Sequence, residues 1–406
     1  MATAGGPDIE RDGLVFGYDT GYGVADNFTT TRFYTGEPTT NLVPSGQSTG
    51  TSVFQRQGYH VEVFTYSQIT DYRGRPNVHK LYINPTTTNP YADFGGQYYK
   101  SGGSVVGDVY TISFDYYTTK GTGTPGMVVV YANGYKTPTS SGAASLSSAT
   151  VIDLENGWKR KTQTATITTA GNSWFRLGLN SNSVETEVYI DNFQVELNSH
   201  ATPFSDGTRS STQSLIDLTK TTNIDVSNVS FDSTGQPTFD GTDDYIQISL
   251  TGADLDSGCT IEGVLKRNST PSAWRTFFNI KPSGANTPFF EFRSNASNQH
   301  IYADYYNGTD YSTNAASLTT GDYGHAIATY DGNGNLKMYF NGELIHTKTG
   351  VPSFALGTSP RLTIGRAYSN DRYTDIEAPV VKVYDRALSA DEVQQNYNAY
   401  KNRFNL

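Results

Sequence analysis

Most of this chain alternates between apolar and polar residues, and this two-residue period limits its fold more than any other feature of the sequence. The segment from Tyr110 to Tyr116 reads Tyr-Thr-Ile-Ser-Phe-Asp-Tyr. Successive side chains of a β-strand point to opposite faces, so this order predicts a half-buried strand with its aromatic rings toward the core. Similar runs begin at Trp174, Val188 and Leu336. The pattern predicts antiparallel strands with one buried face each.

Turn-forming residues separate these runs. The chain has 406 residues, of which 40 are Gly and 29 are Tyr, and 17% are charged. Gly permits tight turns, and aromatic residues are enriched in strands. The segments 331–335 (Asp-Gly-Asn-Gly-Asn) and 341–342 (Asn-Gly) have the composition of hairpin turns. Because this length suffices for two or three domains, we expect an all-β chain made of two antiparallel β-sandwiches.

One segment at the end of the chain reads as a helix. Ser389 and Glu392 have the three-residue spacing of a capping box, in which each side chain binds the other residue's backbone N–H. Val393, Tyr397 and Tyr400 then recur at spacings of four and three, which places them on one helical face. We therefore expect one short C-terminal helix.

Charge and cysteine content exclude several kinds of partner. The net charge is −10 and the pI is about 5.1, with no Lys/Arg cluster, which disfavours nucleic acid. No apolar run is long enough to cross a membrane. The first seven residues have neither a basic start nor an apolar stretch, so no secretory signal is expected. Cys259 is the single cysteine, and a buried place in a strand is its expected role in a chain made in a reducing cytoplasm.

The second half of the chain resembles a known family. Residues 239–246 (Phe-Asp-Gly-Thr-Asp-Asp-Tyr-Ile) resemble the strand that opens the core of laminin-G-like, concanavalin-A-like jelly rolls. Residues 329–342 look like a late hairpin of that family, and 362–365 with 383–393 look like its closing strand and terminal helix. The resemblance implies a jelly-roll fold but no particular function, because this sandwich hosts lectins, glycosidases and structural modules.

The two ends of that jelly roll are far apart in the sequence. Residues 12–19 are similar to the first strand of such jelly rolls in phage structural proteins, where a segment like 214–218 normally follows soon after. We therefore expect an inserted domain, which a loop tolerates easily when the insert has neighbouring termini. The alternative is two sandwiches in series after a loose arm. The expected parts are an arm and first strand at 1–39, an insert at 40–204, and the jelly roll at 205–406.

The inserted group resembles carbohydrate-binding jelly rolls of the galactose-binding-like class. The resemblance rests on a Gly-Trp turn at 157–158, a strand at 174–179 and a final strand at 188–196 (Val-Tyr-Ile-Asp-Asn-Phe-Gln-Val-Glu). Such modules often carry a structural calcium held partly by the acid of the last strand, here Asp191. A single aspartate does not define a calcium site, and a solvated or turn-capping acid fits the position equally well.

The residues give no pattern for catalysis. The glucanase signature Glu-x-Asp-x-x-Glu is approached only at Tyr373-Thr-Asp-Ile-Glu377, where Tyr373 replaces the first acid. Asp243 and Asp244 are adjacent, so on a strand they point to opposite faces. The six histidines lack ligand spacing, and His325 is expected to be a packed core residue. We expect no enzyme.

A sugar ligand would need exposed aromatic faces with polar groups beside them. Trp174 and Trp274 begin strand-like runs and are expected in the core. Two tyrosine-rich segments, 302–311 and 366–373, are better candidates, although Tyr and Arg also favour protein interfaces. The candidate ligand-binding residues are Tyr305, Tyr306, Tyr311, Tyr368, Arg372, Tyr373 and Trp158.

These features together predict a non-enzymatic surface protein of a tailed-phage virion, either a capsid or tail decoration protein or a fibre component, that aids attachment to host-surface glycans. One alternative is a tail-fibre adhesin with dedicated polysaccharide binding, and another is a secreted bacterial carbohydrate-binding protein. The expected partners are other virion proteins, host polysaccharide and further copies of the chain. No cofactor is expected apart from a structural calcium.

Overall fold

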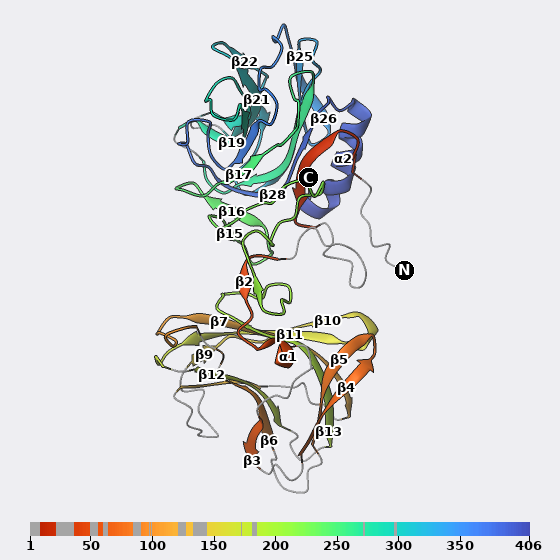
Figure 1. The fold of residues 1–406 in the computed structure, drawn as a ribbon, viewed down its shortest axis with the longest axis vertical. Coiled ribbons are helices and arrows are strands. Elements are labelled where there is room, and N and C mark those ends of the chain that lie inside the picture. The colour runs from red at the N-terminus through yellow and green to blue at the C-terminus, as the bar shows by residue number, and fades with distance from the viewer. Residues whose placement is uncertain are drawn as a thin grey trace. The chain divides into compact units, whose positions relative to one another are not determined.

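The structure is a computed structural model, and the division of the chain is its first feature (Figure 1). Unit 1 combines Met1–Pro38 with Ser210–Leu406, and unit 2 is Thr39–Arg209. The chain leaves unit 1 after Pro38, where the sequence suggested residue 39, and returns after Arg209, where it suggested residue 204. The structure describes residues 9–21, 36–48, 56–59, 64–83, 91–96, 98, 100–120, 127–132, 144–171, 173–180, 185–270, 273–295 and 299–406.

The described residues of unit 1 form two antiparallel sheets. The first sheet has the order β15-β16-β28-β18-β24-β25-β26, with β1 also paired to β28, and the second has the order β17-β27-β19-β20-β21-β22, with β23 paired to β21. The strands are β1 (Leu14–Asp19), β15 (Ser230–Phe231), β16 (Pro237–Asp240), β17 (Ile246–Ser249), β18 (Cys259–Arg267), β19 (Arg275–Lys281), β20 (Phe289–Ser294), β21 (His300–Tyr306), β22 (Asp310–Ser312), β23 (Ala316–Ser317), β24 (Tyr323–Tyr330), β25 (Asn335–Phe340), β26 (Glu343–Thr349), β27 (Arg361–Ile364) and β28 (Asp375–Tyr384).

The core of unit 1 lies between these sheets. Alternate residues of β18 and β20, such as Ile261 and Phe292, are fully buried in one apolar cluster. Cys259 belongs to it too, which confirms its expected place in a buried strand. The expected hairpin turns at 331–335 and 341–342 join β24 to β25 and β25 to β26. Asn341 and Gly342 both have positive φ, the requirement of a tight hairpin turn.

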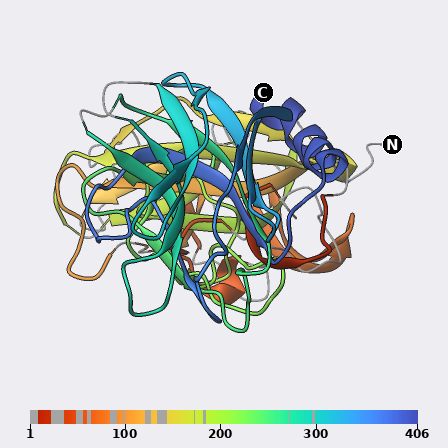
Figure 2. The same ribbon diagram turned by 90° about the horizontal axis from the view of Figure 1, so that it is seen from above.

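The helix α2 (Ala390–Phe404) packs on the outside of the first sheet, and Figures 1 and 2 both show it outside the strands. Ser389 and Glu392 form the expected capping box. Val393 and Tyr400 are buried, so the predicted apolar stripe is the face in contact. No helix among the described residues is long and apolar enough to span a membrane.

Unit 2 is also built from antiparallel sheets. Its larger sheet has the order β10-β11-β7-β13-β5-β4, with β9 paired to β11, and the others are β3-β6-β12-β8 and β14-β2. The elements are β2 (Thr39–Thr40), α1 (Ser45–Ser48), β3 (Arg56–Tyr59), β4 (Phe64–Tyr72), β5 (Arg75–Ile83), β6 (Tyr91–Gly96), β7 (Val109–Lys120), β8 (Met127–Ala132), β9 (Ala144–Leu146), β10 (Thr150–Asp153), η2 (Glu155–Gly157), β11 (Lys159–Ile167), β12 (Ser173–Asn180), β13 (Thr186–Glu196) and β14 (Thr208–Arg209).

Candidate functional site

The outer face of the second sheet in unit 1 gathers aromatic and charged side chains on β20 and β21. Phe290 and Phe292 of β20 lie in the core, so strand alternation turns the residues between and beside them outward. The pairing register sets Phe289 opposite Tyr306, followed by two further pairs along the strands. We call this surface the β20–β21 track; its members are Phe289, Glu291, Arg293, Tyr302, Asp304 and Tyr306.

One end of the track is a stack of three aromatic rings. The ring centroids of Phe289 and Tyr306 are 5.1 Å apart, and that of Tyr368, from the loop after β27, lies 4.1 Å from Phe289. Phe289 is buried, whereas Tyr306 and Tyr368 are half-buried. Lys281 Nζ donates to the Tyr368 carbonyl at 2.5 Å and so fixes the loop on the sheet. Burial and the charges of two nearby arginines lower the pKa of Lys281 to about 8.

The middle of the track is a pair of buried carboxyl groups on neighbouring strands. Glu291 and Asp304 stand directly opposite each other. Arg293 lies 3.1 Å from Asp304 and 3.9 Å from Glu291, measured between guanidinium nitrogen and carboxylate oxygen. Burial raises the pKa of Glu291 to about 8 although Arg293 opposes the change, and burial also raises that of Asp304. Glu291 therefore keeps its proton to a higher pH than an exposed glutamate does.

The other end of the track is again aromatic. The rings of Trp274 and Tyr302 meet edge to face at 6.0 Å, and the Arg293 guanidinium lies 4.7 Å from the centre of the Trp274 ring. Trp274 is 39% exposed, so its predicted place in the core is wrong. The hydroxyl of Tyr302 is buried and has no hydrogen-bond partner in the described parts of the chain. The track thus ends in one exposed ring and one unsatisfied polar group.

A cleft of about 220 Å³ opens at one end of the sandwich, where five strands begin or end. We call it the end cleft. Its lining includes the last residues of β16, β18 and β20 and the first residues of β19 and β28, together with Tyr373. Those five strand termini are Asp240, Arg267, Ser294, Arg275 and Asp375.

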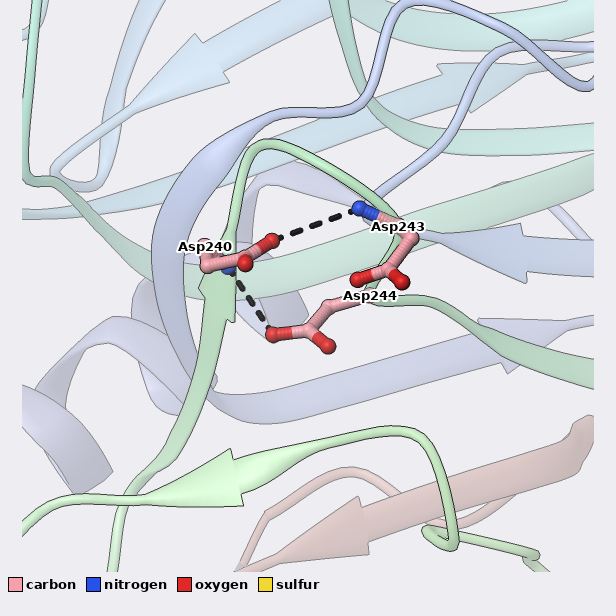
Figure 3. Close-up of side chains that lie close together, drawn as sticks. All are labelled: Asp240, Asp243 and Asp244. Atoms are coloured by element: carbon pink, nitrogen blue, oxygen red, sulfur yellow. Dashed lines mark hydrogen bonds between the residues drawn. The ribbon is translucent and has the colours of Figure 1, made fainter.

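Three aspartates lie together in the turn between β16 and β17 (Figure 3). The Asp240 carboxylate accepts hydrogen bonds from the backbone N–H groups of Thr242 and Asp243, at 2.7 and 3.3 Å. The Asp244 carboxylate accepts from the Asp240 N–H at 3.0 Å. These bonds account for two of the acids as parts of a tight turn, and the group alone does not define a cation site.

The predicted ligand-binding residues separate into distinct groups. Tyr306 and Tyr368 meet on the track, and Tyr373 lines the end cleft. Arg372 is exposed on the loop between β27 and β28. It is close enough to Glu291 for its charge to oppose the rise in the pKa of that residue. Tyr311 is half-buried and packs against the core of unit 1.

Two of these predictions are wrong. Tyr305 is fully buried and stacks on Phe354 at 4.0 Å, because it pairs with Phe290 and takes the inward face of β21. Trp158 of unit 2 is 1% exposed and packs against Tyr72 and the Arg75 guanidinium. Neither ring presents a face to a ligand.

The predicted calcium ligand of unit 2 has a protein partner instead. The Asp191 carboxylate lies 3.0 Å from Arg75, whose guanidinium also reaches Asp115 at 3.0 Å. Burial raises the pKa of Asp191 to about 6, against the opposing charge of Arg75. The Arg75 guanidinium thus supplies a positive charge between the Asp191 and Asp115 carboxylates. In this structure Asp191 belongs to a buried ion pair with Arg75, and its expected calcium role stays a prediction.

Similar solved structures were found at low identity. The binding domain of botulinum neurotoxin serotype D is 16% identical with a TM-score of 0.38, covering 47% of this chain and 49% of that one. A heptameric SAP-like pentraxin from Limulus polyphemus is 14% identical with a TM-score of 0.32, covering 39% of this chain and 78% of that one. The chain spans about half the length of the neurotoxin domains. No curated protein matches it.

A family model matches within unit 1. It covers residues 240–394, from the end of β16 into α2, and its description is the concanavalin A-like lectin/glucanases superfamily. The matched region contains the whole β20–β21 track and the whole end cleft lining. Residues 240–394 therefore form a domain of the concanavalin A-like lectin/glucanase superfamily.

Proposed function

We propose that this chain is a non-enzymatic surface protein of a tailed-phage virion, and that unit 1 binds host-surface glycans along the β20–β21 track. The observation that carries the binding part is the arrangement of the track, with aromatic rings at both ends and charged groups between them. Sugars stack their C–H faces on aromatic rings and give their hydroxyls to polar groups. The Tyr302 hydroxyl, which has no hydrogen-bond partner among the described residues, supplies one such group.

Hydrolysis is the second candidate function, because Glu291 and Asp304 stand opposite each other in a fold that also hosts glucanases. Side chains directly opposite on neighbouring antiparallel strands have Cβ atoms about 4.5–5.5 Å apart. A retaining glycosidase needs two carboxyl groups at about 5–5.5 Å. Binding is favoured over hydrolysis because Glu291 and Asp304 are 2% and 0% exposed and Arg293 lies against both.

The virion part of the proposal rests on the resemblance of residues 12–19 to the first strand of jelly rolls in phage structural proteins. In the structure, β1 lies in the first sheet beside β28, so the opening strand belongs to the same unit as the lectin-type domain. The partners we propose are other virion proteins and host polysaccharide.

A glycan array tests the binding part. The full chain should bind polysaccharides, and the double variant Tyr306→Ala/Tyr368→Ala should lose at least about tenfold in affinity, because two ring faces are removed. Tyr82→Ala removes a half-buried tyrosine of unit 2 and is the matched control. Equal binding by all three proteins would show that the track is not the site. Release of reducing sugar that Glu291→Gln abolishes would replace binding with hydrolysis.

Immunogold labelling of purified virions tests the location. An antibody raised against residues 39–209 should label intact particles, either over the heads or on the tails. Labelled heads would assign a capsid decoration role, and labelled tails would assign the adhesin. Purified particles without label would refute the virion proposal while leaving the glycan array result intact.

A further inference from the structure

The end cleft contains polar groups that the β20–β21 track does not use. Arg267 comes from the first sheet and Ser294 from the second, and strand alternation turns both toward the space between the sheets, since Leu265 and Phe292 lie in the core. Arg267 is 1% exposed and Ser294 is fully buried. The Ser294 hydroxyl has no hydrogen-bond partner among the described residues. A buried hydroxyl without a partner costs free energy unless another molecule satisfies it.

The charges around the end cleft come in both signs. Arg267 and the half-buried Arg275 provide guanidinium groups, while Asp240 and Asp375 provide carboxylates. The Arg267 guanidinium donates to the His300 carbonyl at 2.8 Å, and burial lowers its pKa to about 10. A ligand carboxylate beside the Arg267 guanidinium would favour the charged form of that group. The two carboxylates can accept hydrogen bonds from the hydroxyl groups of a ligand, so the lining suits a molecule that carries both a carboxylate and hydroxyl groups.

The size of the end cleft restricts the ligand further. Its volume of about 220 Å³ is below the range of about 300–1,000 Å³ that pockets for drug-sized ligands occupy. The Tyr373 ring forms part of the wall and can cover one C–H face of a pyranose. One sugar unit, and not a chain of several, matches these dimensions.

We propose that the end cleft is a second binding site, which takes a single sugar unit bearing a carboxylate. Arg267 and Arg275 face the carboxylate, and the Ser294 hydroxyl donates a hydrogen bond to the ligand. Asp240 and Asp375 accept hydrogen bonds from the ligand's hydroxyl groups. This inference rests on the proposed glycan binding of unit 1 but uses residues outside the track. Ser294 follows Arg293 and Arg275 follows Trp274, so the site begins at the exposed aromatic end of the track.

Saturation-transfer NMR and calorimetry on the full chain, with free D-glucuronate and D-glucose as ligands, test the proposal. D-glucuronate should bind and D-glucose should bind at least about tenfold more weakly, since it offers no carboxylate to the guanidinium groups. Arg275→Gln and Ser294→Ala should each weaken D-glucuronate binding, by about tenfold or more for the arginine. Arg73→Gln changes an exposed arginine of unit 2 and should have no effect. Tyr306→Ala/Tyr368→Ala should also leave this binding intact, because those rings lie on the track.

Other outcomes would overturn the assignment. Equal binding of D-glucose, or equally tight binding of the amino acid glycine, would show that a carboxylate-bearing sugar is not the preferred ligand. Loss of D-glucuronate binding in EDTA would mean that a cation at the aspartates recognises the sugar in place of the guanidinium groups. Absence of D-glucuronate binding by a protein that remains positive on the glycan array would refute this inference alone. If the full chain binds no polysaccharide on the glycan array, the proposed function itself is refuted.

Discussion

A buried ionic cluster joins the helix α2 to the first sheet, and it makes a quantitative prediction possible. The Glu262 carboxylate accepts hydrogen bonds from Lys382 Nζ at 3.0 Å, from Asn396 Nδ2 of α2 at 2.7 Å and from the Tyr384 hydroxyl at 3.3 Å. His325 Nε2 lies 3.0 Å away. Glu262 and Lys382 are both fully buried. We predict that Glu262→Gln destabilises unit 1 strongly at neutral pH.

The magnitude follows from the charge that the substitution leaves behind. Burial alone would raise the pKa of Glu262, but Lys382 and His325 outweigh it and lower the pKa from 4.5 to about 2. This difference corresponds to about 3 kcal/mol. Removing one partner of a buried ion pair costs about 3–5 kcal/mol, which is the same size. Because the folded pKa lies below the unfolded value, the contribution is present above about pH 4.5 and is lost as the pH falls toward 2.

Urea unfolding of the full chain, followed by pulsed hydrogen exchange and mass spectrometry, measures this effect in each unit separately. Peptides from β18 should report a loss of about 3 kcal/mol for Glu262→Gln at pH 7, shrinking as the pH approaches 2. Peptides from β7 in unit 2 should not change. Glu343→Gln, at an exposed position of β26, should stay within about 0.5 kcal/mol of the wild type. A small or pH-independent effect of Glu262→Gln would refute the argument.

Three further predictions concern other buried groups. Glu291→Gln should stabilise unit 1 above pH 8 and change its stability little below pH 4.5. The pKa of Glu291 is raised in the folded protein, so ionisation of this buried group lowers the free energy of unfolding as the pH rises between those values. Urea titrations at pH 4 and pH 9 would check this prediction. Gly263→Ala should destabilise unit 1 by at least about 1–3 kcal/mol in urea unfolding, since the added Cβ would lie 2.1 Å from the Phe278 ring. EDTA should leave the melting temperature of unit 2 unchanged, because Arg75 already balances the charge of Asp191; a calorimetric shift would support the calcium hypothesis.

The features that sequence predicted well depend on neighbours along the chain. The capping box of Ser389 and Glu392 and the turn at Asn341 are settled within a few residues, so their physical causes are visible in the sequence. The alternation of apolar and polar residues is equally local, and it correctly predicts strands. The resemblance of residues 239–393 to concanavalin-A-like jelly rolls agrees with the family model over residues 240–394.

The site was less predictable because it depends on strand register. Tyr305 and Tyr306 were both expected at a ligand rim, but they lie on a strand, where neighbouring residues face opposite ways and only Tyr306 points outward. Spacing along the sequence reveals acids that share one strand, but Glu291 and Asp304 meet across two strands, and their pairing depends on the register. Trp274 directly precedes β19, and the sequence does not show where a strand begins, so its exposure could not be predicted.

The two outer faces of unit 1 differ in how their buried carboxyl groups are compensated, and this difference favours the second sheet as the binding surface. Under α2, the carboxylate of Glu262 accepts from Lys382 and Asn396, and its pKa is lowered. On the second sheet, burial outweighs the charge of Arg293, and the pKa of Glu291 is raised. Uncompensated burial costs stability, and it persists where a ligand supplies the missing partners. A glycan seated on the track would supply them.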